Sequence, residues 1–535
     1  MSKGLIFFLD KRKNRTIIPK GAQKMKKRIL SFVSLLLCLI LSLSMLVSCD
    51  NTSTNVSDEA SNPETSTETS SDVSGDGEKV YVADIPNKKY DGETFYIHTA
   101  FYERGAAGYT LFGNYNDSEY ESNVVNDAVE NRNYAVEELL DIKIVEKCVE
   151  SSRTTSGKDH AAMDTIMNAG SETYHMFCPN MYSAASFSMQ SRLVNLLDEE
   201  YLHDLSEPWW DSFFVKDIAI NDRLDFVTGD MTLYARNGLF VTLFNKDIVN
   251  NYGIPNLYDL VREKKWTIDK VYEYSKMMLE ELDGNGVYNY NDKYGFGGQA
   301  DTMTFWFYSF GGRIVSANSE GELVNSLYNE TNVEFVNKIR EFMLDDIYVN
   351  ANDYFNDPGY KNTPTELLFE AFANDRSMFL NADLVFFKDV GEMKSDFGVL
   401  PSPLFDEGIG EYTQALNCWN TNPVCIADYI SDEDIEFATI VMEALGAASK
   451  NIVTPASVET TLKNQKTRDD DSIEMLDIIF NNVGADIAHV YNWDNMGWML
   501  NNLISNSTLE FSSFAQSYEG ALNKAVNDLI EAYQE

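Results

Sequence analysis

The sequence predicts an α/β protein built from two lobes, each of them a sheet flanked by helices. Three observations predict this class. Short segments with strand character alternate with longer segments in which apolar residues recur at positions i, i+3 and i+4. The order strand, helix, strand, helix, strand at the start of the folded part implies an open parallel sheet. Aromatic residues make up 13% of the 535 residues, which is far too many for a disordered chain.

The first sheet is predicted from three strands and the two helices between them. Thr94–Thr99, Ile142–Val149 and Tyr174–Cys178 have strand character, and Asn123–Leu140 and Lys158–Asn168 have helical periodicity. Ligands of open α/β sheets lie beyond the carboxyl ends of the strands. The loops after the first and third strands, 100–105 and 179–182, are therefore predicted binding loops.

The rest of the chain is mostly helical and returns to strand character three times. Strands are predicted at Leu239–Asn245, Ser377–Leu380 and Asp396–Pro401. Helices are predicted at Thr267–Leu282, with Thr267 and Asp269 as capping residues, at Asp432–Ala447 and at Thr508–Tyr533.

This pattern predicts that the folded body, residues 80–535, passes between two lobes more than once. We expect 80–242 and 372–402 to form the first lobe. Residues 243–371 and 403–535 are expected to form the second.

The N-terminus predicts export. Lys26, Lys27 and Arg28 precede an apolar run from Ile29 to Val47, as in a secretory signal peptide. The run ends in Leu46-Val47-Ser48-Cys49, which resembles the lipobox of bacterial lipoproteins. This resemblance implies that residues 1–48 are removed and that Cys49 carries a diacylglycerol. A plain transmembrane anchor is the alternative, since the run is long enough to span a bilayer. Residues 1–24 are best explained by a misassigned start codon, with Met25 as the true start.

Residues 49–79 predict a lipidated, flexible tether. They are rich in Ser, Thr, Asp and Glu and have almost no large apolar residue, so they cannot offset the entropy of ordering. Removal of residues 1–48 takes away ten basic residues and one acidic residue, which leaves 32 basic against 83 acidic residues and a net charge of about −51. Such a chain is not expected to bind nucleic acid, and the lipid rather than a basic patch must hold it at the membrane.

Four cysteines, Cys148, Cys178, Cys418 and Cys425, remain in the folded body. Export permits disulfides, and Cys418 and Cys425 could bridge across a turn. Small buried side chains are the alternative. Their spacing does not match a zinc site.

Several phrases resemble the extracellular solute-binding proteins of bacterial ABC importers, in particular the sugar-binding, maltose-binding-protein-like group. They run through most of the body in that family's order: Asn131-Arg132-Asn133, Pro208-Trp209-Trp210, Phe244-Asn245-Lys246 followed by Gly253, Lys265-Trp266-Thr267, Asp283–Gly295, Phe372–Met378 and Asp396–Pro401. The resemblance implies two lobes joined by hinge strands that close on a ligand. It also implies a permease partner, and because the sequence has no P-loop, the ATPase would be a separate chain.

These features together predict a lipid-anchored, monomeric protein on the outer face of the cell membrane that captures a sugar, with an oligosaccharide favoured. Sugar rings bind flat aromatic platforms through their C–H faces and bind carboxylates and amides through their hydroxyls. Catalysis is not expected, since no HExxH, GxSxG or P-loop motif is present. A secreted carbohydrate-active enzyme and a ligand-presenting sensor lipoprotein are the alternatives.

The candidate ligand-binding residues are the tryptophans that adjoin polar residues or Gly-Gly, and the acids or amides near strand ends or the lobe crossing. The alternative for each tryptophan is core packing, and for each acid a solvated surface position. The candidates are Glu103, Asn180, Asp230, Trp306, Asp383, Trp419, Trp493 and Trp498.

Residues 281–292 (ELDGNGVYNYND) resemble a twelve-residue calcium loop with Gly286 at the sharp turn. Its oxygen ligands would come from Glu281, Asp283, Asn285, Val287, Asn289 and Asp292, and a bound calcium ion would be structural. The loop opens with Glu where the pattern has Asp and closes with Asp where it has Glu. A solvated turn without metal is therefore the alternative, and no other cofactor is expected.

Overall fold

The computed structural model describes residues 79–101, 109–110, 113–114, 124–151, 153–232, 235–236, 238–360, 363–384, 393–408, 410–462 and 470–534. These residues belong to one compact unit, Glu78–Glu535. The predicted signal peptide, Cys49 and Glu103 lie outside the described residues, as does the predicted tether up to residue 78. No helix within the described ranges is both long and apolar enough to cross a membrane.

The first sheet has the strand order β4-β1-β5 and is parallel throughout, as predicted. It consists of β1 (Glu93–Phe101), β4 (Ile142–Glu150) and β5 (Met176–Cys178), and the connections run through α2 (Val124–Leu140) and α3 (Lys158–Ala169). Each of these elements overlaps its predicted range closely, because period-2 and period-3.6 apolar patterns are strong local signals.

The second sheet has the strand order β10-β7-β11-β6-β12. Its strands are β10 (Tyr348–Asn350), β7 (Tyr294–Gly298), β11 (Ser377–Asp383), β6 (Phe240–Asn245) and β12 (Phe397–Leu400). Strands β10, β7 and β11 are parallel to one another, and β6 is antiparallel to both of its neighbours. All residues of β6, β7, β11 and β12 are buried, so both faces of this sheet are covered.

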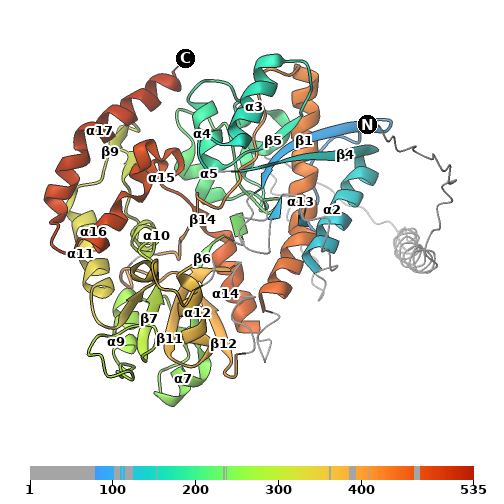
Figure 1. The fold of residues 1–535 in the computed structure, drawn as a ribbon. Helices are drawn as coiled ribbons and strands as arrows, with labels where there is room; N and C mark the ends of the chain where they lie inside the picture. The colour runs from blue at the N-terminus through green and yellow to red at the C-terminus, as the bar shows by residue number, and fades with distance from the viewer. Residues whose placement is uncertain are drawn as a thin grey trace, which may run out of the picture. The chain divides into compact units, whose positions relative to one another are not determined.

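The predicted division of the chain between the lobes is wrong for 372–402. Strands β11 and β12 flank β6, with Leu380 paired to Leu243 and Val399 paired to the same residue on its other side. This backbone pairing places 372–402 in the second sheet. In addition, α13 (Asp432–Leu462) lies alongside α2, so part of 403–535 packs beside the first sheet (Figure 1). Apolar patterns identify strands but carry no information about their partners.

Two predicted helices have different ends in the structure. The helix that begins after Thr267 stops at Ser275, and the helix that begins at Asp432 continues through Pro455 to Leu462. The Thr267 side chain accepts a hydrogen bond from the Lys270 amide, as expected of a capping residue.

Shorter elements complete the unit. The other helices are α4 (Met181–Ser188), α5 (Ser212–Ile218), α7 (Lys246–Asn251), α8 (Leu257–Arg262), α9 (Ile268–Ser275), α10 (Thr302–Ser309), α11 (Glu330–Met343), α12 (Thr365–Ala373), α14 (Asp470–Asn481), α15 (Ile487–Tyr491), α16 (Asn502–Ser505) and α17 (Phe511–Ala532). The short strands are β2 (Tyr109–Thr110), β3 (Gly113–Asn114), β8 (Val315–Ala317), β9 (Leu323–Asn325), β13 (Gln414–Ala415) and β14 (Val483–Gly484). The 3-10 helices are η1 (Leu196–Asp198), η2 (Glu200–Leu205), η3 (Ala351–Tyr354) and η5 (Trp493–Asn501).

All four cysteines of the body are free thiols. Cys178, Cys418 and Cys425 are buried, and burial raises the pKa of each thiol, which keeps it protonated and unreactive. The predicted bridge between Cys418 and Cys425 is absent from the described structure, which agrees with the alternative of small buried side chains.

The position of α13 depends on close contact with Trp209. This indole is 1% exposed, and a Cβ added at Gly446 of α13 would lie 2.2 Å from its Cδ1 atom. Glycine at 446 therefore lets the helix backbone pack directly on the ring. Gly520 of α17 is also inside a helix, but a Cβ added there would meet nothing within 4 Å.

These two glycines give opposite predictions. Gly446→Ala should lower the free energy of unfolding by about 1–3 kcal/mol, because the methyl group overpacks the core. Gly520→Ala should raise it by about 0.5–1 kcal/mol, because alanine is the better helix former. Urea denaturation of both variants checks this, and equal effects would contradict the packing of α13 on Trp209.

Candidate ligand-binding site

Polar residues follow three parallel strands of the second sheet at the point where each strand ends. Gln299 and Asp301 come after β7, Asn352 comes after β10, and Asp383 is the last residue of β11. The carboxyl ends of parallel strands meet at one edge of a sheet. These side chains consequently line a common cavity of about 540 Å³.

The loop after β13 and the 3-10 helix η5 complete the wall of the cavity. Together the described lining residues provide four aromatic rings, six amides and two carboxylates. They are Phe240, Gln299, Asp301, Asn352, Phe355, Asp383, Asn417, Trp419, Asn420, Asn495, Trp498 and Asn501.

Amide groups hold both carboxylates in place. The Asn417 side chain donates a hydrogen bond of 3.3 Å to Asp383, and the Asn501 side chain donates one of 2.6 Å to Asp301. The Thr304 hydroxyl in turn donates to the Asn501 carbonyl oxygen over 2.9 Å. A network of this kind fixes the direction in which each carboxylate presents its remaining lone pairs.

The two tryptophans of the cavity contact residues that follow the first sheet. The Trp498 indole nitrogen donates a hydrogen bond of 2.9 Å to the hydroxyl of Tyr182, which lies in α4 just after β5. The ring of Tyr182 also meets Trp419 edge-on at 6.3 Å, and the Arg153 guanidinium lies 5.7 Å from the centroid of Trp419. Residues that follow the first sheet thus contact the two indoles of the cavity wall without belonging to its described lining.

A buried, neutral histidine of α15 packs against Trp498. His489 meets the Trp498 ring edge-on at 4.3 Å, and burial lowers the pKa of His489 to about 3, so it is neutral at physiological pH. Asp486 caps α15 by accepting a hydrogen bond from the Ala488 amide, and burial raises the pKa of its carboxyl to about 6.

Three of the eight candidates predicted from the sequence line this cavity, namely Asp383, Trp419 and Trp498. Trp419 is 39% exposed, which is unusual for an indole, and it therefore offers surface to a ligand.

The other described candidates lie elsewhere. Trp306 is fully buried among aromatic rings, and Trp493 stacks on Tyr491 at 5.5 Å. Asn180 caps α4 and donates to Asp159, so it positions the helix that carries Tyr182.

Asp230 belongs to a buried ion cluster. Its carboxylate lies 3.4 Å from Arg236 and 3.3 Å from Lys450, and it accepts a hydrogen bond of 2.7 Å from Thr454. These partners account for its charge, and it does not line the cavity.

Sequence reasoning missed most of the polar lining. Asn417 and Asn420 flank Trp419, and Asn495 lies between the two tryptophans of η5, so closeness to a candidate tryptophan was an available signal. Gln299, Asp301 and Asn352 follow strands β7 and β10, which the sequence did not predict.

The acidic loop closes into a tight turn. One ligand oxygen from each of Glu281, Asp283 and Asp292 lies within 4.8 Å of the others. Asp292 is fully buried and accepts hydrogen bonds from the backbone amides of Leu282, Asp283 and Asn289.

The remaining predicted ligands of this loop also take part in hydrogen bonds within it. The Asn285 amide donates to Glu281, the Asn289 side chain donates to Asp283, and the same side chain donates to the Val287 carbonyl oxygen. Several of the oxygens that a cation would need are thus already acceptors.

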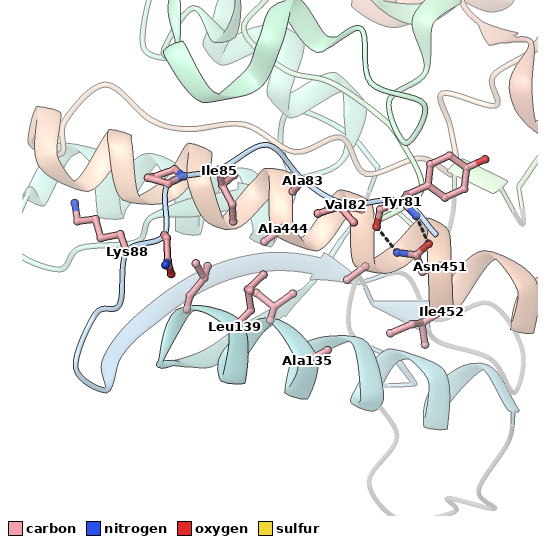
Figure 2. Close-up of a pocket in the computed structure, with 16 residues that line it drawn as sticks. Tyr81, Val82, Ala83, Ile85, Lys88, Ala135, Leu139, Ala444, Asn451 and Ile452 are labelled. Carbon is pink, nitrogen blue, oxygen red and sulfur yellow. Dashed lines mark hydrogen bonds between the residues drawn. The ribbon is translucent and has the colours of Figure 1, made fainter. Parts of the chain in front are cut away.

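Another hollow, of about 360 Å³, lies between 81–88, α2 and α13 (Figure 2). Its lining is mostly aliphatic, and its main polar feature is a pair of hydrogen bonds between the Asn451 side chain and the Tyr81 backbone. Among its described lining residues there is no carboxylate and no indole.

No family model and no curated protein matches this sequence. Solved structures match it. A sugar transporter from Rhizobium etli in an open conformation has a TM-score of 0.52 and 13% identity, over 82% of this chain and 99% of that one. An ABC substrate-binding protein from Listeria monocytogenes in complex with cycloalternan has a TM-score of 0.48 and 14% identity, over 82% of this chain and 100% of that one.

The Rhizobium etli match confirms the predicted fold class. The protein has the two-lobed α/β fold of solute-binding proteins, with sheets flanked by helices. At 13% identity this likeness concerns the fold alone.

Two asparagines of one loop are predicted to affect stability differently. The Asn420 carbonyl oxygen is buried and has no hydrogen-bond partner among the described residues, whereas Asn422 donates to the backbone carbonyls of Ala100 and Cys178. Asn420→Leu should therefore leave the free energy of unfolding unchanged or raise it, and Asn422→Leu should lower it by about 1–3 kcal/mol. Denaturant melts of both variants check this, and a loss for Asn420→Leu as large as that for Asn422→Leu would contradict it.

Proposed function

We propose that this protein captures a carbohydrate in the cavity beside Trp419 and Trp498 and delivers it to the permease of an ABC importer. One observation carries the proposal. Two indoles, six amides and two carboxylates line a single cavity at the carboxyl ends of the strands. Indoles stack on the C–H faces of sugar rings, amides donate and accept hydrogen bonds around the ring edges, and carboxylates accept them.

The size of the cavity agrees with a small-molecule ligand. Its volume of about 540 Å³ falls within the range of small-molecule sites. The fold match to a protein named as a sugar transporter supports the same class of ligand.

The rest of the proposed setting comes from the sequence. A diacylglycerol on Cys49 would anchor a monomeric protein to the outer face of the membrane, with residues 49–79 as the tether. The ATPase of the importer would be a separate chain, and no cofactor takes part in capture.

A secreted glycosidase is the second candidate, because the cavity contains two carboxylates, Asp301 and Asp383. Glycosidases use such a pair as acid and base or nucleophile. A sensor lipoprotein that presents the ligand to a receptor would use the same site as a transport protein. Capture is preferred since it needs only the groups present and the fold is that of solute-binding proteins.

A thermal unfolding screen tests the proposal. The protein without its signal peptide is melted against mono- and oligosaccharides, and each glycan is weighed by mass spectrometry after long incubation. A glycan at 100 times its Kd should add about 2.7 kcal/mol of stability, which raises the Tm by a few degrees. Stabilisation with unchanged glycan mass is expected. Steady shortening of the glycan would replace the proposal with the glycosidase, and no response to any glycan would refute it.

The tryptophans give a matched pair of variants. Trp419→Ala should weaken glycan binding by tenfold or more, about 1.4 kcal/mol, because it removes an exposed stacking platform. Trp493→Ala should lower stability but leave affinity unchanged, since Trp493 packs on Tyr491 outside the cavity. Isothermal titration with the glycan found in the screen measures both. Equal affinities for the two variants would contradict the placement of the site.

Calcium tests whether the acidic loop, residues 281–292, binds a metal ion. If it holds a structural ion, millimolar calcium should raise the Tm relative to EDTA, and Asp283→Asn should remove that difference. Asp283 is exposed, so the substitution itself should cost little stability. If calcium and EDTA give the same Tm, the loop is a solvated turn that binds no metal.

A further inference from the structure

The charged groups among the described lining residues of the cavity all have one sign. Asp301 and Asp383 are its ionisable residues, and its other lining residues are amides and aromatic rings. No Lys, Arg or His stands among the lining residues within the described part of the chain. Among the described lining residues, an anionic group entering this cavity would therefore meet two carboxylates and no cation.

The surroundings contain one nearby cation and a strongly acidic chain. Arg153 is the cation seen beside the wall, where its guanidinium lies over the ring of Trp419. Its single positive charge is outnumbered by the two negative charges of Asp301 and Asp383 in the lining. The chain as a whole carries 84 acidic against 42 basic residues, so its long-range field also repels anions.

The hydrogen-bonding character of the wall points the same way. The side-chain oxygens of Asn417 and Asn420 are buried and lack hydrogen-bond partners among the described residues. The orientation of Asn417 is fixed, because a carboxylate accepts only and the NH2 group must therefore face Asp383. Both lining carboxylates accept hydrogen bonds only, so the wall favours a ligand that brings hydrogen-bond donors.

We infer that this cavity selects glycans that carry hydrogen-bond donors and no negative charge, and that Asp301 and Asp383 enforce the selection. Neutral and amino-substituted sugars share this chemistry, whereas uronates and phosphorylated sugars are excluded. The inference rests on the proposed function and adds the class of sugar to it. The cost of bringing a second negative charge close to a carboxylate in a partly desolvated cavity is its physical basis.

Matched sets of sugars that differ in one group test the inference. One set is glucose, glucosamine and glucuronate, another is galactose, galactosamine and galacturonate, and a third is maltotriose, the trimer of glucosamine and trigalacturonate. Isothermal titration with the protein lacking its signal peptide gives the Kd of each. In every set that binds, the uronate should bind at least tenfold more weakly than the neutral sugar. In each set, the Kd of the amino sugar relative to that of the neutral sugar shows whether the cavity prefers an ammonium group or a hydroxyl group.

Variants then assign the selection to the carboxylates. Asp301→Asn and Asp383→Asn each remove one charge at nearly constant shape, and each should reduce the discrimination against the uronate by at least threefold. Glu334→Gln changes the net charge equally, but Glu334 is an exposed residue of α11 outside the cavity lining, and the discrimination should stay unchanged. If Asp383→Asn does not fold, the ratio of the uronate Kd to the neutral-sugar Kd in Asp301→Asn, compared with the same ratio in the wild-type protein, still tests the inference.

Two outcomes would overturn the inference in distinguishable ways. A uronate that binds as tightly as its neutral counterpart would refute the charge selection and leave carbohydrate capture standing. Failure of every neutral, amino and acidic sugar to bind would refute the proposed function, and the inference with it.

Discussion

The carboxyl ends of parallel strands are the constraint on which the site depends. A parallel strand delivers the residues that follow it to one edge of its sheet, and the second sheet does this with β7, β10 and β11. Gln299, Asp301, Asn352 and Asp383 are far apart in sequence but line the same cavity for this reason. The first sheet contributes α4 after β5, and through it the Tyr182 hydroxyl that fixes Trp498. Neither sheet alone would supply both the polar groups and the oriented indole.

The cavity is built at some cost to stability. The amide oxygens of Asn417 and Asn420 are buried without partners among the described residues, and an unsatisfied buried acceptor is destabilising. Asn420, whose oxygen is an unpaired buried acceptor among the described residues, lines the cavity. Asn422, two residues later in the same loop, donates a hydrogen bond to the backbone of Ala100. The buried charges of Asp211, Arg236, Asp230 and Lys450, by contrast, are paired in one ion cluster.

How far the site could be predicted differs from residue to residue. Trp419 and Trp498 were identifiable because each lies among Asn, Asp or Gly residues, a pattern typical of loops rather than of cores. Trp493 satisfied the same rule, and Trp306 was a candidate because Gly311-Gly312 follows its segment. Both pack on other rings, because local composition does not reveal what lies opposite a side chain. Asp301 and Asn352 were not predicted as site residues, because the strands that precede them, β7 and β10, were not predicted. β7 is rich in glycine, which hides its strand character in the sequence. The glycine is required by a tertiary contact, since a Cβ at Gly298 would lie 2.3 Å from the Tyr348 hydroxyl.

The sequence by itself determined the local elements and the fold class. Apolar periodicity defined β1, α2, β4 and α3 almost to the residue, since that signal depends only on neighbours along the chain. Only the tertiary structure decided which strands pair and which side chains meet. The insertion of β6 between β11 and β12, which moved 372–402 into the second sheet, arises from backbone hydrogen bonds between residues more than a hundred positions apart. The meeting of Trp498 with Tyr182 likewise depends on long-range packing that no local pattern encodes.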